Sequence, residues 1–212
     1  MEKTKNSSPL LTNRKNRGII AKIFDSGGPE MIFEEKKITL KNGTTATFRS
    51  PRVEDAEKLL DYLRAVSSET DFLMRRGCDS LPDVESERKW ISDGIASPNN
   101  LRIICEIDGV VAGNCEIMMN SRFRTSHRAT LAIAIRKEYW GLGIGTVMFE
   151  ELEAAARAHD GVTQLELECF ADNTRAQGLY KKMGFKIDYV HHDALRRADG
   201  KFTDEYGMVK KL

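Results

Sequence analysis

The sequence contains no long hydrophobic segment. Its longest uninterrupted apolar run, from Leu131 to Ile135, is far shorter than the about 20 residues that a membrane-spanning helix needs. The lysines near the N-terminus are not followed by the apolar core of a secretory signal. We therefore expect a protein of the reducing cytoplasm that has no membrane partner.

Cysteine is scarce, and no two cysteines form a CxxC pair. The chain has 4 cysteines: Cys78, Cys105, Cys115 and Cys169. Three of them lie in apolar, strand-like segments, where a free thiol behaves as a small hydrophobic group. His191 and His192 are adjacent, and neighbouring strand residues point to opposite faces, so one ion cannot easily use both. Neither a disulfide framework nor a metal site is indicated.

A surplus of one charge is also missing. Lysine and arginine number 33, aspartate and glutamate number 32, and the net charge is +1. A protein that binds nucleic acid through its phosphates normally carries a basic surplus, so nucleic acid is not an expected partner. The 212 residues, 41% of them hydrophobic, suffice to bury the core of one domain.

The N-terminal segment differs from the rest of the chain. Residues 1–30 are rich in Lys, Asn, Ser and Gly and show no sustained periodicity, which predicts a flexible extension before a domain at residues 31–212. The pair Gly27-Gly28 can be encoded by GGA-GGN, which resembles a bacterial ribosome-binding sequence. We therefore expect Met31 to be the biological start and the extension to be a translated leader.

Hydrophobic periodicity predicts both strands and helices in this domain. Asn42-Gly43 tolerates the positive φ angles of a tight turn and predicts a hairpin, and Ser50-Pro51 offers the start of the first helix. That helix carries its apolar residues at positions 56–63, and further helices are expected at 84–95, 145–159 and 173–183. Strands are expected at 37–41, 44–48, 101–107, 110–119, 129–135, 165–170, 185–191 and 203–209.

The most informative segment is the strand at 129–135 together with the glycines that follow it. Gly141, Gly143 and Gly145 stand at alternate positions and precede a helix. Such glycines let the backbone turn tightly, and the N–H groups at a helix N-terminus attract phosphate. The loop therefore suits a pyrophosphate, although ordinary strand-to-helix turns also contain this spacing.

A dinucleotide-binding βαβ unit is a competing interpretation of this segment. Glu168 ends the next strand roughly 20 residues later, where an acid would hold a ribose. Against it, residues 136–140 separate the strand from the glycines, the third glycine of the dinucleotide motif is missing, and no second βαβ half follows. A nucleotide-dependent oxidoreductase is therefore the less favoured alternative.

A second motif lies downstream of the glycine loop. Residues 173–180 read NTRAQGLY and residues 183–185 read MGF. With the glycine loop, and in this order and separation, they resemble the GNAT superfamily of acetyl-CoA-dependent N-acetyltransferases over the segment from Ile38 to Leu212. Trp140 departs from the loop signature, which has Gln or Arg at that position. The resemblance implies a single α/β (α+β) domain, with a mixed, mostly antiparallel sheet that splits to admit CoA and with helices on both faces.

The resemblance assigns the co-substrate acetyl-CoA to particular positions of this chain. Ile133 and Ile135 would present main-chain groups to its pantetheine arm, as a sheet edge does to an added strand, and Asn173 would hydrogen-bond the same molecule. The backbone N–H groups expected to hold its pyrophosphate are those of Leu142, Gly143, Ile144, Gly145 and Thr146.

The implied reaction is direct transfer of the acetyl group to a primary amine while both substrates are bound. Tyr180 is the expected acid for the leaving thiolate, although its place in an apolar helical stripe also fits core packing. Family members often carry the base on the strand at 129–135, which has no carboxylate here. Glu116 on the neighbouring strand is the first candidate for the base, and a water chain, Glu168 and His127 are the alternatives.

The acceptor amine is left open among amino acids, polyamines, aminoglycosides and protein N-termini. Near neutral pH a larger fraction of an α-amine than of a lysine-like amine is neutral, so an amino acid, peptide or protein N-terminus is favoured. A non-catalytic acyl-CoA-binding module is the alternative function, and the oligomeric state is open, a homodimer included. Two basic clusters indicate either a solvated surface or a site for carboxylates: Arg122, Arg124 and Arg128, and Arg75 with Arg76.

Overall fold

The computed structural model describes residues 19–22 and 30–212, and the side chains from Met31 onward. The strands are β1 (Ile19–Lys22), β2 (Glu30–Phe33), β3 (Lys36–Thr39), β4 (Thr45–Arg49), β5 (Asn100–Ile107), β6 (Val110–Met119), β7 (Arg128–Ile135), β8 (Gln164–Phe170), β9 (Lys186–Arg196) and β10 (Phe202–Lys211). The helices are α1 (Ala56–Glu69), α2 (Val84–Ile95), α3 (Ile144–Ala158) and α4 (Thr174–Lys182), with short 3-10 helices η1 (Val53–Asp55) and η2 (Lys137–Tyr139).

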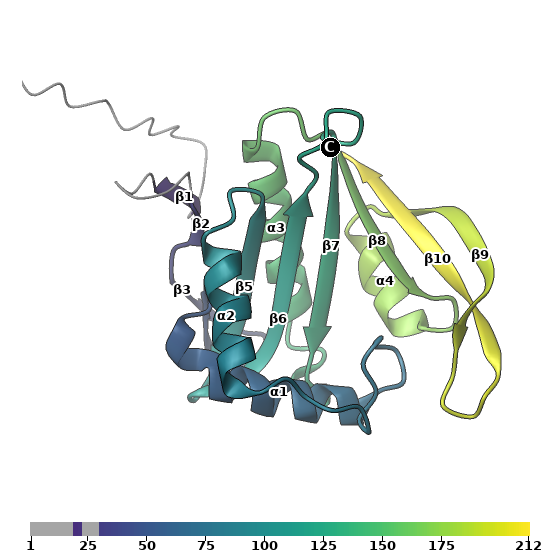
Figure 1. The fold of residues 1–212 in the computed structure, drawn as a ribbon, viewed down its shortest axis with the longest axis horizontal. Helices are drawn as coiled ribbons and strands as arrows, with labels where there is room; N and C mark the ends of the chain where they lie inside the picture. Colours follow the sequence, from purple (N-terminus) through teal and green to yellow (C-terminus); the bar gives the residue numbers. More distant parts are fainter. Residues whose placement is uncertain (1–18, 23–29) are drawn as a thin grey trace, which may run out of the picture.

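The strands form one eight-stranded sheet, in the order β3-β4-β5-β6-β7-β8-β10-β9, and a separate pair of β1 with β2. In the large sheet every neighbouring pair is antiparallel except β7 and β8, which are parallel. Their pairing joins residues 128–130 to residues 164–166, and beyond it the two strands diverge (Figure 1). The predicted mixed, mostly antiparallel sheet with a central split is confirmed.

Helices cover both faces of the sheet, as predicted. Figure 1 shows α1 and α2 in front of the sheet and α3 and α4 behind it. Met148 and Leu152 of α3 belong to the larger buried cluster, whereas Leu59 of α1 and Ile91 of α2 belong to a second cluster on the opposite face. Burial of apolar surface on both sides holds the strands between two helical layers.

The start of the first helix differs from the sequence prediction. The helix begins after η1, with Asp55 at its N-cap position, and not at Ser50-Pro51. The Ser50 hydroxyl accepts a hydrogen bond from the Phe33 N–H at 2.9 Å and donates one to the Arg102 carbonyl at 3.1 Å. Because the serine hydroxyl bonds to β2 and β5, it does not cap the helix.

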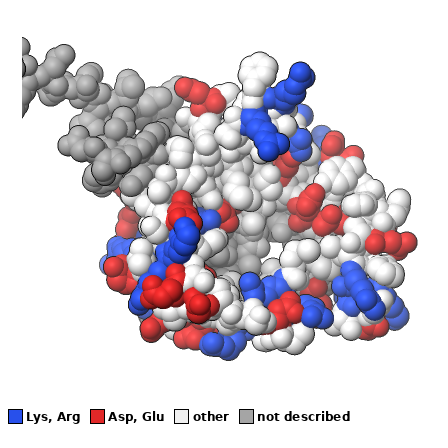
Figure 2. Space-filling model, viewed as in Figure 1, with Lys and Arg blue, Asp and Glu red and all other residues white. Residues whose placement is uncertain are grey.

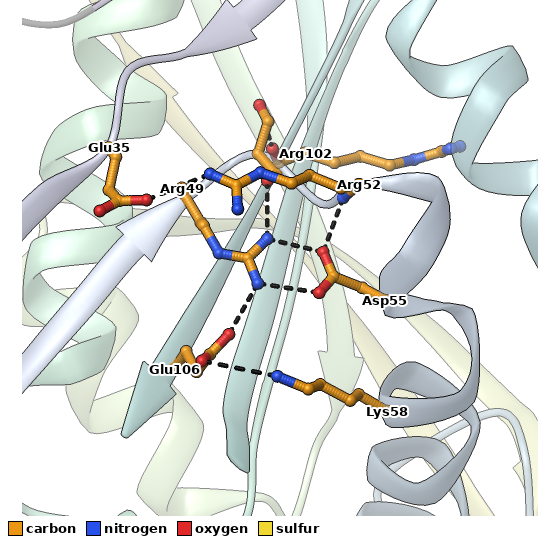
Figure 3. A network of polar contacts seen from close by, with 8 residues as sticks. Glu35, Arg49, Arg52, Asp55, Lys58, Arg102 and Glu106 are labelled. Atoms are coloured by element: carbon orange, nitrogen blue, oxygen red, sulfur yellow. Dashed lines mark hydrogen bonds and ion pairs between the residues drawn. The ribbon is translucent and has the colours of Figure 1, made fainter. Parts of the chain in front are cut away.

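A buried ion-pair network fixes α1 to the sheet (Figure 3). The Arg49 guanidinium of β4 donates to both carboxylate oxygens of Asp55, at 2.6 and 2.8 Å, and to Glu106 of β5 at 2.6 Å. Lys58 of α1 lies 3.6 Å from the other oxygen of Glu106. Burial raises the pKa of Asp55, but hydrogen bonds from Arg49 and from the Arg52 N–H outweigh it and lower that pKa below its ordinary value.

Cys105, Cys115 and Cys169 are buried free thiols in strands, in agreement with their predicted role as small hydrophobic groups. The predicted hairpin joins β3 to β4, and Gly43 occupies its turn at φ 86°.

Much of the predicted N-terminal extension, residues 1–18 and 23–29, lies outside the described residues. None of the helices that the structure describes is long and apolar enough to cross a membrane. Figure 2 shows acidic and basic side chains interspersed over the face that carries α1 and α2.

Candidate active site

A cleft of about 870 Å³ lies where β7 and β8 diverge. Its walls come from β7, the glycine loop, α3, α4, β8, β9, β10 and the loop between α1 and α2. The predicted site residues that line it are Ile133, Ile135, Gly143, Ile144, Gly145, Thr146, Asn173 and Tyr180. Leu142 and Glu116 lie outside the cleft. The structure thus brings together residues of both sequence motifs.

The glycine loop adopts the conformation that only glycine takes without strain. Gly141 and Gly143 have φ angles of 82° and 98°, and Gly143 is the N-cap of α3. The N–H group of Thr146 donates to the Gly143 carbonyl at 3.0 Å, so it is already used within the helix. A helix leaves the N–H groups of its first residues without intrahelical partners, and here they belong to Ile144 and Gly145. Of the N–H groups predicted to hold the pyrophosphate, that of Thr146 is therefore bonded within the helix, and helix geometry leaves those of Ile144 and Gly145 open.

Gly145 has a packing role that its spacing alone does not reveal. A Cβ atom at this position would lie 2.8 Å from Cδ2 of Leu179 in α4. Leu142 does not line the cleft; its carbonyl accepts the Lys41 N–H at 3.2 Å, and its side chain packs on the core. These contacts hold the β3–β4 hairpin and α4 against the glycine loop.

Two basic side chains that the sequence analysis did not identify line the cleft beside this loop. Lys41 follows β3, and its side chain would be 3.7 Å from a Cβ atom at Gly143. Arg175 stacks over the ring of Trp140 at 4.4 Å. Arg175 lies within the second motif, and its place in that motif could have identified it from the sequence. Lys41 comes from a distant hairpin, and no local pattern points to it.

The edge of β7 is exposed where β8 has diverged. The Arg136 N–H donates to the Ala112 carbonyl at 2.9 Å, on the β6 side. In an antiparallel ladder, hydrogen-bonding groups alternate in direction along the strand, so those of Ile133 and Ile135 are directed toward the opening. The Trp140 indole donates to the Ile135 carbonyl at 2.7 Å. Trp140, the departure from the motif, therefore occupies part of this edge.

Asn173 and Tyr180 lie at the start and the end of α4. The side-chain oxygen of Asn173 caps the helix by accepting the Ala176 N–H at 3.1 Å. Tyr180 packs edge-to-face on Phe149, with ring centroids 5.5 Å apart, and is nearly buried. Burial raises the pKa of its hydroxyl, which therefore stays protonated near neutral pH. Tyr180 serves the core and lines the cleft at once.

Another wall of the cleft carries Glu168, Glu205 and His191, which we call the acidic cluster. Strand β10 pairs Glu205 with Phe170 of β8 and with His191 of β9, and it pairs Gly207 with Glu168. Cross-strand partners share a face, as do residues two positions apart, so the three side chains lie on the same face. Burial raises the pKa of Glu205, and the charge of Glu168 raises it further.

Tyr189 orients Glu168 within this cluster. Its hydroxyl donates to Glu168 Oε1 at 2.6 Å, and this hydrogen bond raises the pKa of Tyr189 to about 12. The ring lies against Gly207, where a Cβ atom would be 2.1 Å from the ring carbons. The missing side chain of Gly207 therefore creates the space that Tyr189 occupies. Glu205, Tyr189 and Gly207 were not identified from the sequence.

Glu116, the first sequence candidate for the base, is engaged elsewhere. It accepts hydrogen bonds from Asn100 Nδ2 at 2.6 Å and from Arg102 Nε at 3.0 Å. Since its carboxylate is paired and lies outside the cleft, this placement argues against a role as base. His127 also lies outside the cleft, whereas Glu168, an alternative from the sequence, lines it.

The basic clusters do not form a carboxylate site in the cleft, because none of their five arginines lines it. Arg128 pairs with Glu166, Arg76 pairs with Asp79, and Arg75 donates to the Ser80 carbonyl. His192 pairs with Asp204 while its neighbour His191 lines the cleft. In the part of the chain that the structure describes, no three His, Cys, Asp or Glu side chains are arranged to hold a metal ion.

Comparison with known proteins identifies the family of this chain. The model of the Acetyltransferase (GNAT) family matches residues 63–185. The chain is 28% identical over 125 residues to the L-amino acid N-acetyltransferase AaaT of Escherichia coli (strain K12). This match covers 59% of this chain and 76% of that protein. It is 32% identical over 104 residues to a Bacillus subtilis (strain 168) protein provisionally named as a ribosomal protein bS18-alanine N-acetyltransferase, covering 46% of this chain and 64% of that protein.

The fold also matches solved structures. A crystal structure of a GNAT-family acetyltransferase from Streptococcus pneumoniae superposes with a TM-score of 0.74 and 31% sequence identity. The match covers 79% of this chain and 99% of the other. The domain described above therefore corresponds to nearly the whole of that protein.

Proposed function

The chain belongs to the acetyltransferase (GNAT) family, and on this basis we propose that it transfers the acetyl group of acetyl-CoA directly to the α-amine of an amino acid, peptide or protein N-terminus. The observation that carries this proposal is the single cleft shared by the glycine loop, the open edge of β7, Tyr180 and the acidic cluster. Two relatives support an α-amine, since one is named for L-amino acids and the other for an alanine of a ribosomal protein.

Acetyl-CoA supplies an activated acetyl thioester, and the residues at the glycine loop fit its pyrophosphate. The N–H groups at the start of α3 and the positive end of the helix dipole favour an anion there. Lys41 and Arg175 add two positive charges beside the loop. Asn173 and the main chain of Ile133 are proposed to bind the rest of the molecule along the opening. The family, the loop conformation and the two basic side chains support this assignment.

Two proton transfers are assigned to the residues of the cleft. Glu205 is proposed to accept a proton from the acceptor ammonium, because a raised pKa makes a carboxylate a stronger base near neutral pH. Glu168, held by Tyr189, is proposed to bind that ammonium. Tyr180 is proposed to donate its hydroxyl proton to the departing sulfur, which its raised pKa permits because the phenol stays protonated.

The test is an acetyl-CoA consumption assay with the full chain and a panel of amines. The panel contains free amino acids, short peptides with a free N-terminus, spermidine and an aminoglycoside. The proposal expects turnover with α-amines and slower turnover with the other amines. Turnover confined to spermidine or the aminoglycoside would contradict the α-amine assignment. Tight binding of acetyl-CoA without turnover on any amine would favour a non-catalytic acyl-CoA-binding module.

A further inference from the structure

We infer that the acceptor is the α-amine of a peptide or amide, in preference to that of a free amino acid, because the acceptor end of the cleft carries two glutamates and no lysine or arginine for an α-carboxylate. This inference rests on the proposed function, of which it narrows the substrate class. It follows from how charge is distributed along the described residues that line the cleft.

The positive and negative groups lie at different ends of the cleft. Its lysine and arginine are Lys41 and Arg175, and both contact the glycine loop or the Trp140 ring beside it. Glu168, Glu205 and the titratable His191 lie together on the face of β8, β10 and β9. An ammonium is attracted to this end, whereas a carboxylate one carbon away would meet like charge without a partner.

Basic residues near this end are already paired. Arg197, which follows β9, is bound to Asp172 and lies 5.3 Å from the centre of the Phe72 ring. Arg75 and Arg76 follow α1 and are bound to Ser80 and Asp79. Recruiting one of them for a substrate carboxylate would break a contact that holds the loop between α1 and α2.

The wall beside the acidic cluster is apolar, because Glu205 pairs across the sheet with Phe170, whose ring lies 5.7 Å from that of Phe72. Phe72, Leu73 and Met74 of the α1–α2 loop line it, together with Phe170 of β8. A neutral peptide group and an uncharged side chain fit such a wall, but a second ammonium of a polyamine would be desolvated against it at a cost. Met74 is 79% exposed, so the wall reaches the surface and leaves an exit for a longer chain.

The experiment compares alanine, alaninamide and trialanine as acceptors for the unmodified full chain. The three share one side chain, and the last two carry no carboxylate beside the amine. From pH profiles, kcat/KM is calculated per neutral amine, which removes differences in amine pKa. We expect alaninamide and trialanine to exceed alanine at least tenfold. Alanine equal to or better than alaninamide, or spermidine better than both, would overturn the inference while leaving acetyl transfer intact.

A variant pair links the preference to the acidic cluster. Glu205→Gln keeps the shape of the side chain and removes its charge. The ratio of kcat/KM for alaninamide to kcat/KM for alanine should therefore fall at least threefold, even if both values decrease. Glu150→Gln on the exposed face of α3 is the matched control and should leave the ratio unchanged. A ratio that is unchanged in both Glu205→Gln and Glu168→Gln contradicts the inference. If the unmodified protein acetylates no amine, the proposed function itself fails, and this inference falls with it.

Discussion

Tyr180 shows how one side chain can satisfy two requirements. Its ring packs on Phe149 and Phe185 in the core, and the same residue also lines the cleft. The apolar stripe that favoured a packing role and the motif that implied an acid role are therefore compatible. Burial, which raises the pKa of the hydroxyl, is a consequence of the packing and keeps the proton available.

Replacement of Tyr180 by Phe tests the proposed acid role. The variant keeps the ring and removes the hydroxyl, so acetyl-CoA affinity and the free energy of unfolding should change little. General acid catalysis contributes about 10² to 10⁴-fold, whereas one neutral hydrogen bond contributes about 1 kcal/mol. We expect kcat to fall at least tenfold in a steady-state assay. Tyr139→Phe, which also changes a tyrosine lining the cleft, is the control and should keep its rate. Full activity in Tyr180→Phe would assign the proton to water or another group.

At the scale of elements, the N-terminus of α3 is shaped by two glycines with different tasks. Gly143 supplies a left-handed backbone conformation, and Gly145 supplies space for Leu179 of α4. A substitution at Gly145 therefore disturbs packing before it affects any ligand. Gly143 is the cleaner position for testing the pyrophosphate assignment, because a Cβ atom there would meet only the flexible Lys41 side chain at ordinary contact distance.

Gly143→Ala should weaken acetyl-CoA binding beyond its cost in stability. An alanine held in the left-handed backbone conformation lowers the free energy of unfolding by roughly 1–2 kcal/mol. Its methyl group would also lie beside the N–H groups assigned to the pyrophosphate. Gly109→Ala, in the exposed turn between β5 and β6 at φ 81°, carries the same backbone strain away from the cleft. Thermal melts with and without acetyl-CoA should show a smaller ligand-induced rise in Tm for Gly143→Ala alone. Equal rises in both variants would remove the pyrophosphate assignment.

The Arg49 network joins three elements, and its loss should be costly. Arg49→Met leaves Asp55 buried without its main partner, and breaking a buried pair in this way costs about 3–5 kcal/mol. Arg52→Met is the matched control, because Arg52 pairs with Glu35 at the surface and should contribute less than about 1 kcal/mol. Urea unfolding of both variants gives the comparison. A cost for Arg49→Met no larger than that for Arg52→Met would contradict the structural role.

The same network predicts how stability depends on pH. The folded-state pKa of Asp55 is lowered, so its carboxylate stabilises the fold above the unfolded pKa of about 3.9. This contribution is lost as the pH falls through the folded-state pKa. The difference in free energy of unfolding between the unmodified protein and Asp55→Asn should therefore be constant near neutrality and shrink below about pH 4. A difference that stays constant down to the folded-state pKa would mean that the charge of Asp55 does not stabilise the fold.

At the scale of the whole molecule, Met31 packs against the core and Phe33 is 2% exposed, so the described side chains contribute to the core from the start of this segment. We propose that the domain begins at Met31, and deletion of residues 1–30 should then change the free energy of unfolding by less than about 1 kcal/mol and leave the acetyl-transfer rate unchanged. Phe33→Ala in the full chain is the comparison and should cost about 3–5 kcal/mol. A truncated protein less stable than Phe33→Ala, or inactive, would show that the first residues belong to the domain.

The local elements and both motifs could be predicted from the sequence because their signals are local. Asn42-Gly43 dictates its own turn, and the apolar spacing of α1 marks its buried face within one segment. The glycine loop and the segment that ends at Tyr180 are short runs whose conformation depends on neighbours in the chain. The helix start at Ser50-Pro51 was wrong because Ser50 bonds to two distant strands, which no local pattern reveals.

Only the tertiary structure decided which carboxylates face the cleft. Glu116, Glu168 and Glu205 are all strand residues, and an acid on a strand carries no periodic signal of the face or neighbour it meets. The register of β10 against β8 and β9 brings Glu205 to Glu168 and His191, whereas the register of β5 against β6 pairs Glu116 with Arg102. These pairings are long-range and are fixed by burial of the sheet as a whole. The sequence by itself therefore determined the fold family and the glycine loop, and the folded sheet decided which carboxylates line the cleft.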